Sequence, residues 1–364
     1  MKRTAGSLSK EPKAKKQRPE VPDYHATPSL RDESGEVIWP APKEQIAKAR
    51  QFILDCVAAG KKTLIVPDKD ADGLSSGAIL QKTLVLLGLE PSLIHSHLLQ
   101  KGHSIHDETE REAMTVHKAD YIFVLDQGSR ESPPVVDTPH QALIIDHHWA
   151  LDSDFPKGSR HVSACNSPPV ATSSLLTYHI CAALHDDVER TCDWLCVVGT
   201  HGDLGNTLKW APPFPDMTAT FKTHTKKALN DVVSLINAPR RTASYNVAAA
   251  WTALATASSP ASLLRSPALL AARAEVNAEV ERCTHAAPHF SADGRIVVLR
   301  ITSAAQVHPE ASGGIVPKDE FEELMAVLEI GRRTKGEGEA ASRGKPRQSN
   351  TLMNYFTSPN KEKA

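Results

Sequence analysis

Four short runs of apolar residues constrain the fold of this chain more than any other feature of its sequence. They occupy residues 63–66, 92–95, 121–125 and 142–145, and helical patterns cover residues 43–59 and 74–88. Apolar strands that alternate with helices are typical of a parallel sheet that is covered on both faces. We therefore predict an α/β fold, a parallel sheet with helices on both faces, whose ligand site lies beyond the carboxyl ends of the strands.

Acidic residues and histidines follow three of these predicted strands directly. The first strand runs into Pro-Asp-Lys-Asp-Ala-Asp-Gly, the third into Asp126, and the fourth into Asp-His-His. Any one of these motifs alone is better explained by a turn, a helix cap or ordinary packing than by a metal site. Three of them at strand ends that meet at one sheet edge would repel one another unless a cation neutralised them. Oxygen ligands joined by imidazole suit Mn²⁺, and also Mg²⁺.

The order of these motifs resembles the DHH phosphoesterases. That family has an Asp-x-Asp-x-Asp-Gly motif, an Asp after an apolar strand, an Asp-His-His motif, and an Asp in a Gly-rich segment. The fourth motif is present here as Gly-Thr-His-Gly-Asp-Leu-Gly at residues 199–205. The resemblance covers residues 60–205. It implies a RecJ-like phosphoesterase with a DHH domain and a smaller C-terminal lobe of the DHHA1 type.

The resemblance also implies roles for individual residues. Two divalent cations, preferably Mn²⁺ and otherwise Mg²⁺, would activate a water for attack on a phosphoryl group. His148 would stabilise charge on the phosphate, and Asp146 would orient the imidazoles. The implied metal ligands are Asp70 and Asp72, one for each cation, Asp126 as the bridge, His147 and Asp203, with Asp68 as an uncertain further member. Many members of the family have a His where this chain has Val66, which leaves the strength of one metal site open.

The second lobe departs from the family pattern. His308, followed by Gly313 and Gly314, resembles the substrate-binding signature of a DHHA1 lobe, although two expected glycines are replaced. A loop histidine without a function is the alternative. The strand at 295–301 is followed too soon by this loop, so we expect an abbreviated lobe, or a chain that lacks a segment.

Charge is distributed unevenly along the chain. Residues 1–20 and 331–364 each carry a net charge of +5, and the residues between them carry −11. Basic tails of this kind often direct nuclear import or contact polyanions. In the C-terminal tail, Leu352, Tyr355 and Phe356 have the i, i+3, i+4 spacing of a helix that docks in a groove, and resemble the peptide that binds the replication sliding clamp. A solubilising tail and a chance apolar cluster are the alternatives.

These patterns predict four segments. They are a disordered basic tail at 1–35, a DHH catalytic domain at 36–238, a helical linker with a DHHA1-like lobe at 239–330, and a second disordered tail at 331–364. The six cysteines have no C-x-x-C spacing and are expected to be reduced thiols. No apolar run is long enough to span a membrane, and the N-terminus lacks the apolar region of a secretory signal. We expect a nuclear protein, or otherwise a cytoplasmic one.

The favoured function is a nuclear exonuclease for single-stranded DNA or short oligonucleotides. A small-molecule phosphatase, acting on phosphoadenosine phosphate or polyphosphate, is the first alternative, because a metal centre of this kind recognises only a phosphoryl group. A non-catalytic replication scaffold is the second. Aromatic residues are scarce, so an extended platform for base stacking is not evident.

Overall fold

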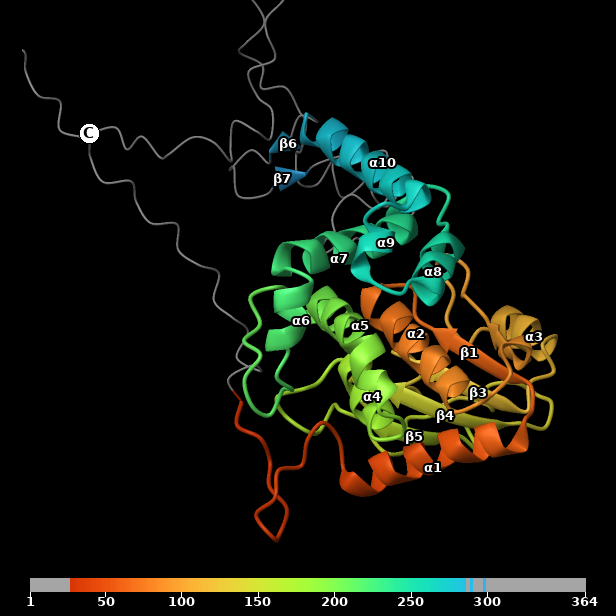
Figure 1. The fold of residues 1–364 in the computed structure, drawn as a ribbon. Helices are drawn as coiled ribbons and strands as arrows, with labels where there is room; N and C mark the ends of the chain where they lie inside the picture. Colours follow the sequence, from red (N-terminus) through yellow and green to blue (C-terminus); the bar gives the residue numbers. More distant parts are fainter. Residues whose placement is uncertain (1–26, 286–288, 291–296, 299–364) are drawn as a thin grey trace, which may run out of the picture.

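A five-stranded parallel sheet forms the centre of the computed structural model, which describes residues 27–285, 289–290 and 297–298 (Figure 1). The strands are β1 (Thr63–Pro67), β2 (Ile94–Ser96), β3 (Tyr121–Leu125), β4 (Gln141–Asp146) and β5 (Arg160–Ser163). Their order is β2-β1-β3-β4-β5, and every neighbouring pair is parallel. The predicted parallel sheet is confirmed, and β5 is a strand that the sequence analysis missed.

Helices account for most of the remaining described residues. They are α1 (Lys43–Ala59), α2 (Ala71–Leu86), α3 (Glu108–Thr115), α4 (Ser173–Ala182), α5 (Asp187–Leu204), α6 (Thr218–Thr223), α7 (Lys226–Arg241), α8 (Val247–Thr256), α9 (Pro260–Leu263) and α10 (Pro267–Thr284). A 3-10 turn spans Pro91–Leu93, and two short strands, β6 (His289–Phe290) and β7 (Val297–Val298), pair antiparallel. No described helix has the length and apolar character needed to cross a membrane.

Successive strand residues point to opposite faces, so the sheet has two apolar clusters. Ile65 and Phe123 pack in the larger cluster, which contains apolar residues of α1, α2, α4 and α5. Val66 and Val124 pack in the smaller cluster, together with Met114 of α3 and residues from the loops after β3 and β4. Both faces are therefore covered, as predicted.

Helix α2 begins earlier than the predicted residue 74. The Asp70 side chain accepts hydrogen bonds from the backbone N–H groups of Asp72 (3.1 Å) and Gly73 (3.2 Å), so it caps the helix and α2 starts at Ala71. This placement puts Asp72 in the first turn of a helix rather than in a loop. The first acidic motif thus belongs partly to a strand end and partly to a helix start.

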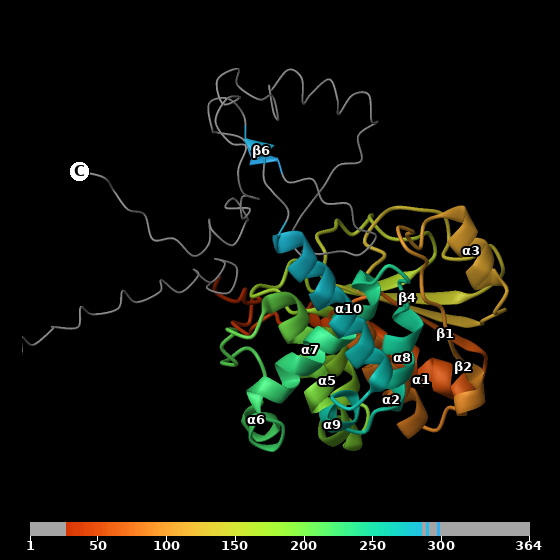
Figure 2. The same cartoon turned by 90° about the horizontal axis from the view of Figure 1, so that it is seen from above.

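The C-terminal helices pack on the helices that cover the sheet. α8 contacts α2 and α7, and α10 lies along α7 and α8 (Figure 2). The break predicted near Pro239 comes slightly later, because α7 continues to Arg241. Helix α7 therefore runs across the predicted domain boundary at 238/239.

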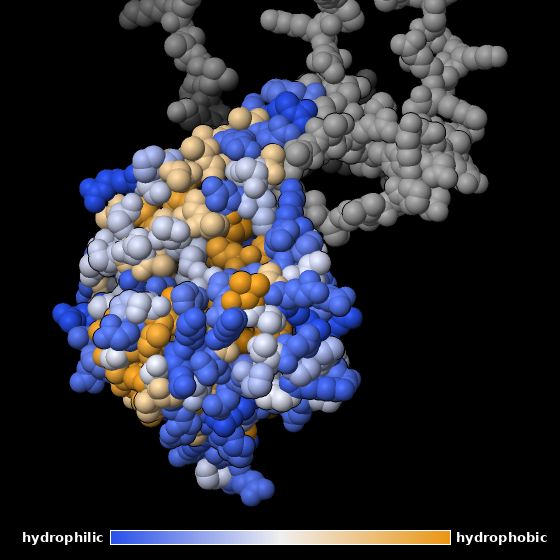
Figure 3. All heavy atoms as spheres, turned by 90° about the vertical axis from the view of Figure 1, so that its right-hand side faces the viewer, coloured by the Kyte–Doolittle hydropathy of each residue, from blue (hydrophilic) through white to orange (hydrophobic). Residues whose placement is uncertain are grey.

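The surface of the described residues mixes polar and apolar side chains, and their cysteines are free thiols. On the face that carries α3 and α8, apolar side chains are interspersed among hydrophilic ones (Figure 3). The six cysteines form no disulfide bonds, and all except Cys165 are buried. Burial raises the pKa of the Cys56 thiol to about 11, which keeps it protonated and unreactive.

The strand order creates a crevice at one sheet edge. The chain passes from β1 to β2 on one side, then crosses to β3 on the other side of β1. Loops that leave β1 and β3 therefore diverge at the carboxyl ends of these strands, which is where ligands bind in open α/β sheets. The first and second acidic motifs flank this crevice.

Candidate metal centre

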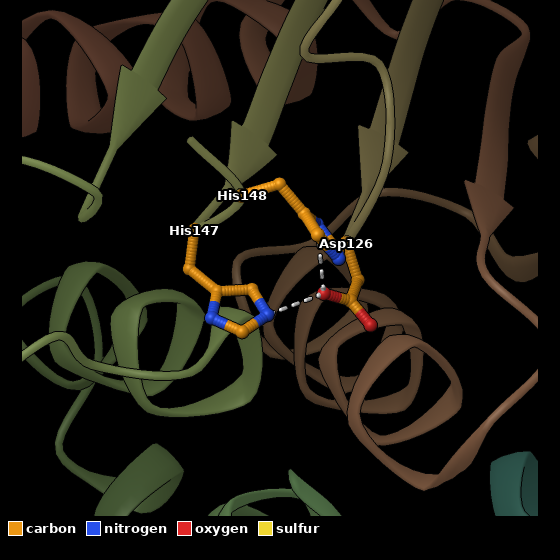
Figure 4. A group of neighbouring side chains, drawn as sticks. All are labelled: Asp126, His147 and His148. Atoms are coloured by element: carbon orange, nitrogen blue, oxygen red, sulfur yellow. Dashed lines mark ion pairs between the residues drawn. The ribbon is translucent and has the colours of Figure 1, made fainter. Parts of the chain in front are cut away.

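Two neighbouring strands deliver an aspartate and two histidines to one place. Asp126 follows β3, while His147 and His148 follow β4, and the three side chains point into the same space (Figure 4). Asp126 is 3% exposed and has a positive φ of 63°. Asp tolerates this left-handed conformation better than most residues, and strained backbone of this kind gathers at functional sites.

The His147 imidazole lies among three carboxylates. Its Nε2 atom is 3.2 Å from Asp126 Oδ1, 3.2 Å from Asp203 Oδ2 and 3.9 Å from Asp72 Oδ2. Although it is buried and close to these oxygens, Nε2 has no hydrogen-bond partner of acceptable geometry among the described residues. A buried ring nitrogen that points between carboxylates without bonding to any of them has the arrangement of a metal ligand.

Asp72 is held in place by the start of another helix. Its two carboxylate oxygens accept hydrogen bonds from the backbone N–H groups of Ser173 (2.7 Å) and Ser174 (2.9 Å), at the N-terminus of α4. The Ser173 hydroxyl also donates to Asp126 Oδ1 at 2.9 Å. The positive end of the α4 dipole thus faces the buried carboxylates and partly offsets their charge.

Glycines in the fourth motif allow Asp203 to reach this cluster. A Cβ atom at Gly199 would lie 2.5 Å from Ser174 Cβ, and one at Gly202 would lie 2.9 Å from Ala71 Cβ. Because these glycines carry no side chain, α5 packs closely against α4 and α2. Asp203 lies in the last turn of α5 rather than in a loop, and its carboxylate points toward His147.

A second group of carboxylates lies on the other side of Asp126. Oxygen atoms of Asp68, Asp70 and Asp126 are all within 4.8 Å of one another, as are the ligand atoms of Asp72, His147 and Asp203. Asp126 thus belongs to the oxygen-only group, and its Oδ1 atom is also 3.2 Å from His147 Nε2 of the second group. Val66 packs in the smaller apolar cluster, and Asp68 occupies the oxygen-only group in the absence of a histidine there.

Burial and mutual repulsion raise the pKa values of the clustered carboxyls. Burial is the main cause for Asp70, Asp72 and Asp126, and each is raised further by a neighbouring carboxylate. Burial alone would lower the pKa of His147, but contacts with Asp126 and Asp203 and the charge of Asp72 raise it to about 12. A proton on His147 thus reduces the repulsion between the neighbouring carboxylates, and a bound cation would have the same effect.

Asp146 and His148 form a separate pair beside this cluster. Asp146 Oδ1 accepts from His148 Nδ1 at 2.8 Å and from the His147 backbone N–H at 2.8 Å, and Oδ2 accepts from the Ser129 hydroxyl at 2.6 Å. Burial is the largest single effect and favours the neutral acid, but the hydrogen bonds from His148 and Ser129 together with the charge of His148 outweigh it and lower the pKa of Asp146. The bond to Asp146 raises the pKa of His148, so Nε2 of this half-exposed ring can carry a proton toward a ligand.

The donor set fits divalent cations. It consists of hard carboxylate oxygens and one imidazole, and it includes the unpartnered Nε2 of His147. Such ligands suit divalent cations such as Mn²⁺ and Mg²⁺. The six predicted metal residues, Asp68, Asp70, Asp72, Asp126, His147 and Asp203, are all brought together, and Asp146 and His148 adjoin them.

A cleft of about 390 Å³ opens beside the metal centre. Asp126, Asp146 and His148 line one side, and Lys69, His103 and Arg130 contribute basic groups to its wall. Sequence reasoning missed these basic residues and also Ser129, Ser173 and Ser174. Thr-Ser-Ser at 172–174 signals a helix start, but no local signal places that helix against Asp72.

Several predicted residues lie outside the described part of the chain. They are the lobe residues His308, Gly313 and Gly314, and the docking residues Leu352, Tyr355 and Phe356. Their roles stay predictions.

Comparison with known proteins places this site in a family context. The model described as DHH family, N-terminal domain, matches residues 62–200. No curated protein matches the chain.

Among the solved structures with similar folds are two RecJ proteins and one DHH domain. One is an exonuclease RecJ bound to manganese, 19% identical, with a TM-score of 0.51, which covers 67% of this chain and 69% of that one. Another is the DHH domain of a member of the s1p family of ribosomal proteins, 15% identical, with a TM-score of 0.51 and coverage of 69% and 65%. RecJ from Thermus thermophilus in complex with Mn²⁺ is 18% identical, with a TM-score of 0.49 and coverage of 68% and 40%. This chain therefore spans less than half the length of the Thermus protein, and the first two likenesses show the fold.

Proposed function

Since residues 62–200 form a DHH-family domain, we propose that this chain is a metal-dependent phosphoesterase that acts as an exonuclease on single-stranded DNA or short oligonucleotides. The observation that carries the proposal is the convergence of His147 with the carboxylates of Asp72, Asp126 and Asp203, with a buried imidazole nitrogen left unpartnered. We further propose that two divalent cations bind here, Mn²⁺ in preference to Mg²⁺.

The two groups of ligands divide the proposed cations. Asp68, Asp70 and Asp126 would hold one, Asp72, His147 and Asp203 would hold the other, and Asp126 would serve both. When bound, such cations supply Lewis-acid activation of the attacking water and neutralise phosphoryl charge. The contribution of the protein is to position the ligands before substrate arrives, through the α4 backbone on Asp72 and the Ser173 hydroxyl on Asp126.

His148 is the residue proposed to contact the scissile phosphate. A carboxylate can only accept, so the hydrogen bond to Asp146 places a proton on Nδ1 and fixes the ring. The same bond raises the pKa of His148, so the ring can take a second proton on Nε2 and donate it in a hydrogen bond to a phosphoryl oxygen as charge develops in the transition state. Asp146 is the positioning residue in this arrangement.

The cleft beside the centre supports a polyanionic substrate. Lys69, His103 and Arg130 stand along its wall, next to His148. Cationic side chains at the entrance to a phosphate site attract a phosphodiester chain and bind it in a salt-dependent manner. A phosphodiester backbone that enters along this wall would reach the metal ligands and His148 together.

Hydrolysis of a 5′-labelled single-stranded DNA oligomer in Mn²⁺ tests the proposal, with phosphoadenosine phosphate and polyphosphate assayed in parallel. Asp126→Asn is the informative variant, because Asn tolerates the left-handed backbone that Asp126 adopts. We expect a loss of at least about a hundredfold in the rate of oligomer cleavage. Glu44→Ala removes an exposed carboxylate of α1 and should leave the rate unchanged.

The outcomes separate the candidate functions. Turnover of only the small phosphates would replace the exonuclease with a small-molecule phosphatase. Manganese binding without turnover of any substrate would contradict the enzyme proposal and favour a replication scaffold.

Nuclear localisation and docking on the sliding clamp are also proposed, from the sequence alone. The basic residues at 1–20 and the triplet Leu352, Tyr355 and Phe356 support them. A peptide of residues 345–364 should bind purified clamp, and replacement of both aromatic residues by Ala should abolish that binding. Cytoplasmic retention of a tagged full-length chain would contradict the nuclear assignment.

A further inference from the structure

An exposed tryptophan immediately follows the Asp-His-His motif. Trp149 is 74% exposed, and it is the aromatic member of the exposed large hydrophobic side chains in residues 27–285. Within this part of the chain its ring stacks on no other aromatic ring. The indole therefore contributes little to the packing of the fold.

The backbone on both sides of Trp149 is anchored. Before it, the N–H groups of His147 and His148 both donate to Asp146 Oδ1, at 2.8 and 3.3 Å. After it, Ala150 is buried in the smaller apolar cluster, and the Leu151 N–H donates to Asp154 Oδ2 at 2.9 Å. An ordered loop thus presents a large aromatic side chain to solvent.

Trp149 is also next to the proposed phosphate contact. His148 lines the cleft of about 390 Å³ that holds the basic residues Lys69, His103 and Arg130. Consecutive Cα atoms lie about 3.8 Å apart, so the exposed Trp149 side chain leaves the backbone next to His148, where it can reach a base of a strand whose phosphate meets His148. Cations along a phosphate path and an aromatic ring beside it are the two components of a single-strand binding site.

We propose that Trp149 is a stacking platform for an unpaired nucleobase of the nucleotide at or next to the scissile phosphate. This inference rests on the proposed function, and it names the substrate class as single-stranded nucleic acid rather than inorganic polyphosphate. A base inside a duplex has both faces covered by its neighbours and cannot stack on the indole, so the platform favours single strands. Every base has a π face, so the contact carries little sequence preference.

Stacking on Trp149 is expected to affect substrate binding more than chemistry. The base does not change during hydrolysis, so the contact stabilises bound substrate and transition state alike. Loss of the indole should raise KM with little change in kcat. Measured stacking contributions correspond to roughly a five- to hundredfold change in KM.

The kinetic test compares Trp149→Ala, Trp149→Phe and the control Leu54→Ala, which removes an exposed apolar side chain from α1. We expect the KM for a single-stranded oligomer to rise in Trp149→Ala, to be largely restored in Trp149→Phe, and to stay unchanged in the control. The KM for tripolyphosphate should be unchanged in all three. Removal of the terminal base from the oligomer should raise the KM of the wild type. The same removal should leave the KM of Trp149→Ala unchanged, because that variant has no indole for the base to stack on.

A binding test separates this inference from the proposed function. In chelator, where no hydrolysis occurs, an oligonucleotide should quench tryptophan fluorescence of the wild type and quench Trp149→Phe much less. The other four tryptophans are less accessible than Trp149, since Trp194 and Trp251 are buried and Trp39 and Trp210 are half-buried. If the wild type shows this quenching difference but hydrolyses no substrate in Mn²⁺, the proposed enzymatic function is refuted and the stacking platform is supported. Equal quenching in both proteins, an unchanged oligomer KM in Trp149→Ala, or an equal rise in KM for tripolyphosphate would overturn the platform.

Discussion

Replacement of Gly199 by Ala tests how the fourth motif builds the metal centre. Ala is favoured over Gly by about 1 kcal/mol in a helix interior, so helix propensity alone predicts that Gly199→Ala stabilises the protein. The tertiary structure predicts the opposite. The added Cβ would lie 2.5 Å from Ser174 Cβ and 3.0 Å from Asp72 Oδ1, whereas carbon–carbon contacts normally begin near about 3.5 Å.

The clash cannot be relieved by a side-chain rotation. Ser174 donates its backbone N–H to Asp72 Oδ1 at 2.9 Å, and its hydroxyl bonds Thr172 Oγ1 at 3.1 Å, so α4 or α5 must shift. Overpacking of this kind costs about 1–3 kcal/mol and occasionally more. The gain of about 1 kcal/mol in helix propensity reduces this cost, so we expect a net loss of up to about 2 kcal/mol in the free energy of unfolding, or up to roughly 8 °C in Tm.

Thermal and urea unfolding, each followed by circular dichroism in chelator and in Mn²⁺, measure both consequences. Displacement of α4 also moves Asp72, so the Mn²⁺-dependent rise in Tm should be smaller in Gly199→Ala than in the wild type. Ser174→Gly removes the opposing side chain and keeps the backbone N–H, so the double variant should recover part of the loss. A Gly199→Ala protein that is as stable as the wild type and keeps its full response to Mn²⁺ would refute this reasoning.

Three further predictions follow from the same geometry. Mn²⁺ at about a hundred times its dissociation constant should stabilise the wild type by about 2.7 kcal/mol and Asp126→Asn by much less, and chelation should reverse the effect in thermal unfolding. In chelator, the contacts that raise the pKa of His147 from 6.5 to about 12 stabilise the fold fully below pH 6.5, and this contribution should decline as pH rises toward 12; His147→Gln should flatten that part of the pH dependence in urea titrations. Glu110 is buried, accepts a hydrogen bond from the Gln100 N–H, and pairs with His97 and His103. Glu110→Gln should lower the free energy of unfolding in urea by about 1–3 kcal/mol, and it should raise the KM for oligomer because His103 lines the cleft. Glu108→Gln, at an exposed position of α3, should change neither quantity.

The sequence predicts the strands well because their signals are local. A run such as Tyr-Ile-Phe-Val-Leu at 121–125 is apolar throughout, and a parallel strand that is buried on both faces requires this. Signals were weaker for β5 (Arg160–Ser163), which begins with Arg and His, and for α3, which is largely charged. Both were missed, since burial at a sheet edge and against loops depends on partners that are distant in the chain.

The candidate ligands came from the resemblance, which also implied that Asp70 and Asp72 serve different cations. The residues that each of these two meets could not be predicted from the sequence. Asp70 and Asp72 are two residues apart, yet Asp70 caps α2 and lies with Asp68, whereas Asp72 lies with His147 and Asp203. Successive residues of a helix start point in different directions, and only the packing of α4 and α5 against α2 decides what each one meets.

By itself, then, the sequence determined the alternation of four of the strands with helices and the motifs that follow three of those strands. These follow from apolar periodicity and from the donor atoms of single residues. Only the tertiary structure decided that the α4 backbone hydrogen-bonds Asp72, that His147 Nε2 lacks a partner among the described residues, and that Trp149 is exposed. Each of these depends on contacts between segments far apart in the chain, and their burial and distances are set by packing rather than by local composition.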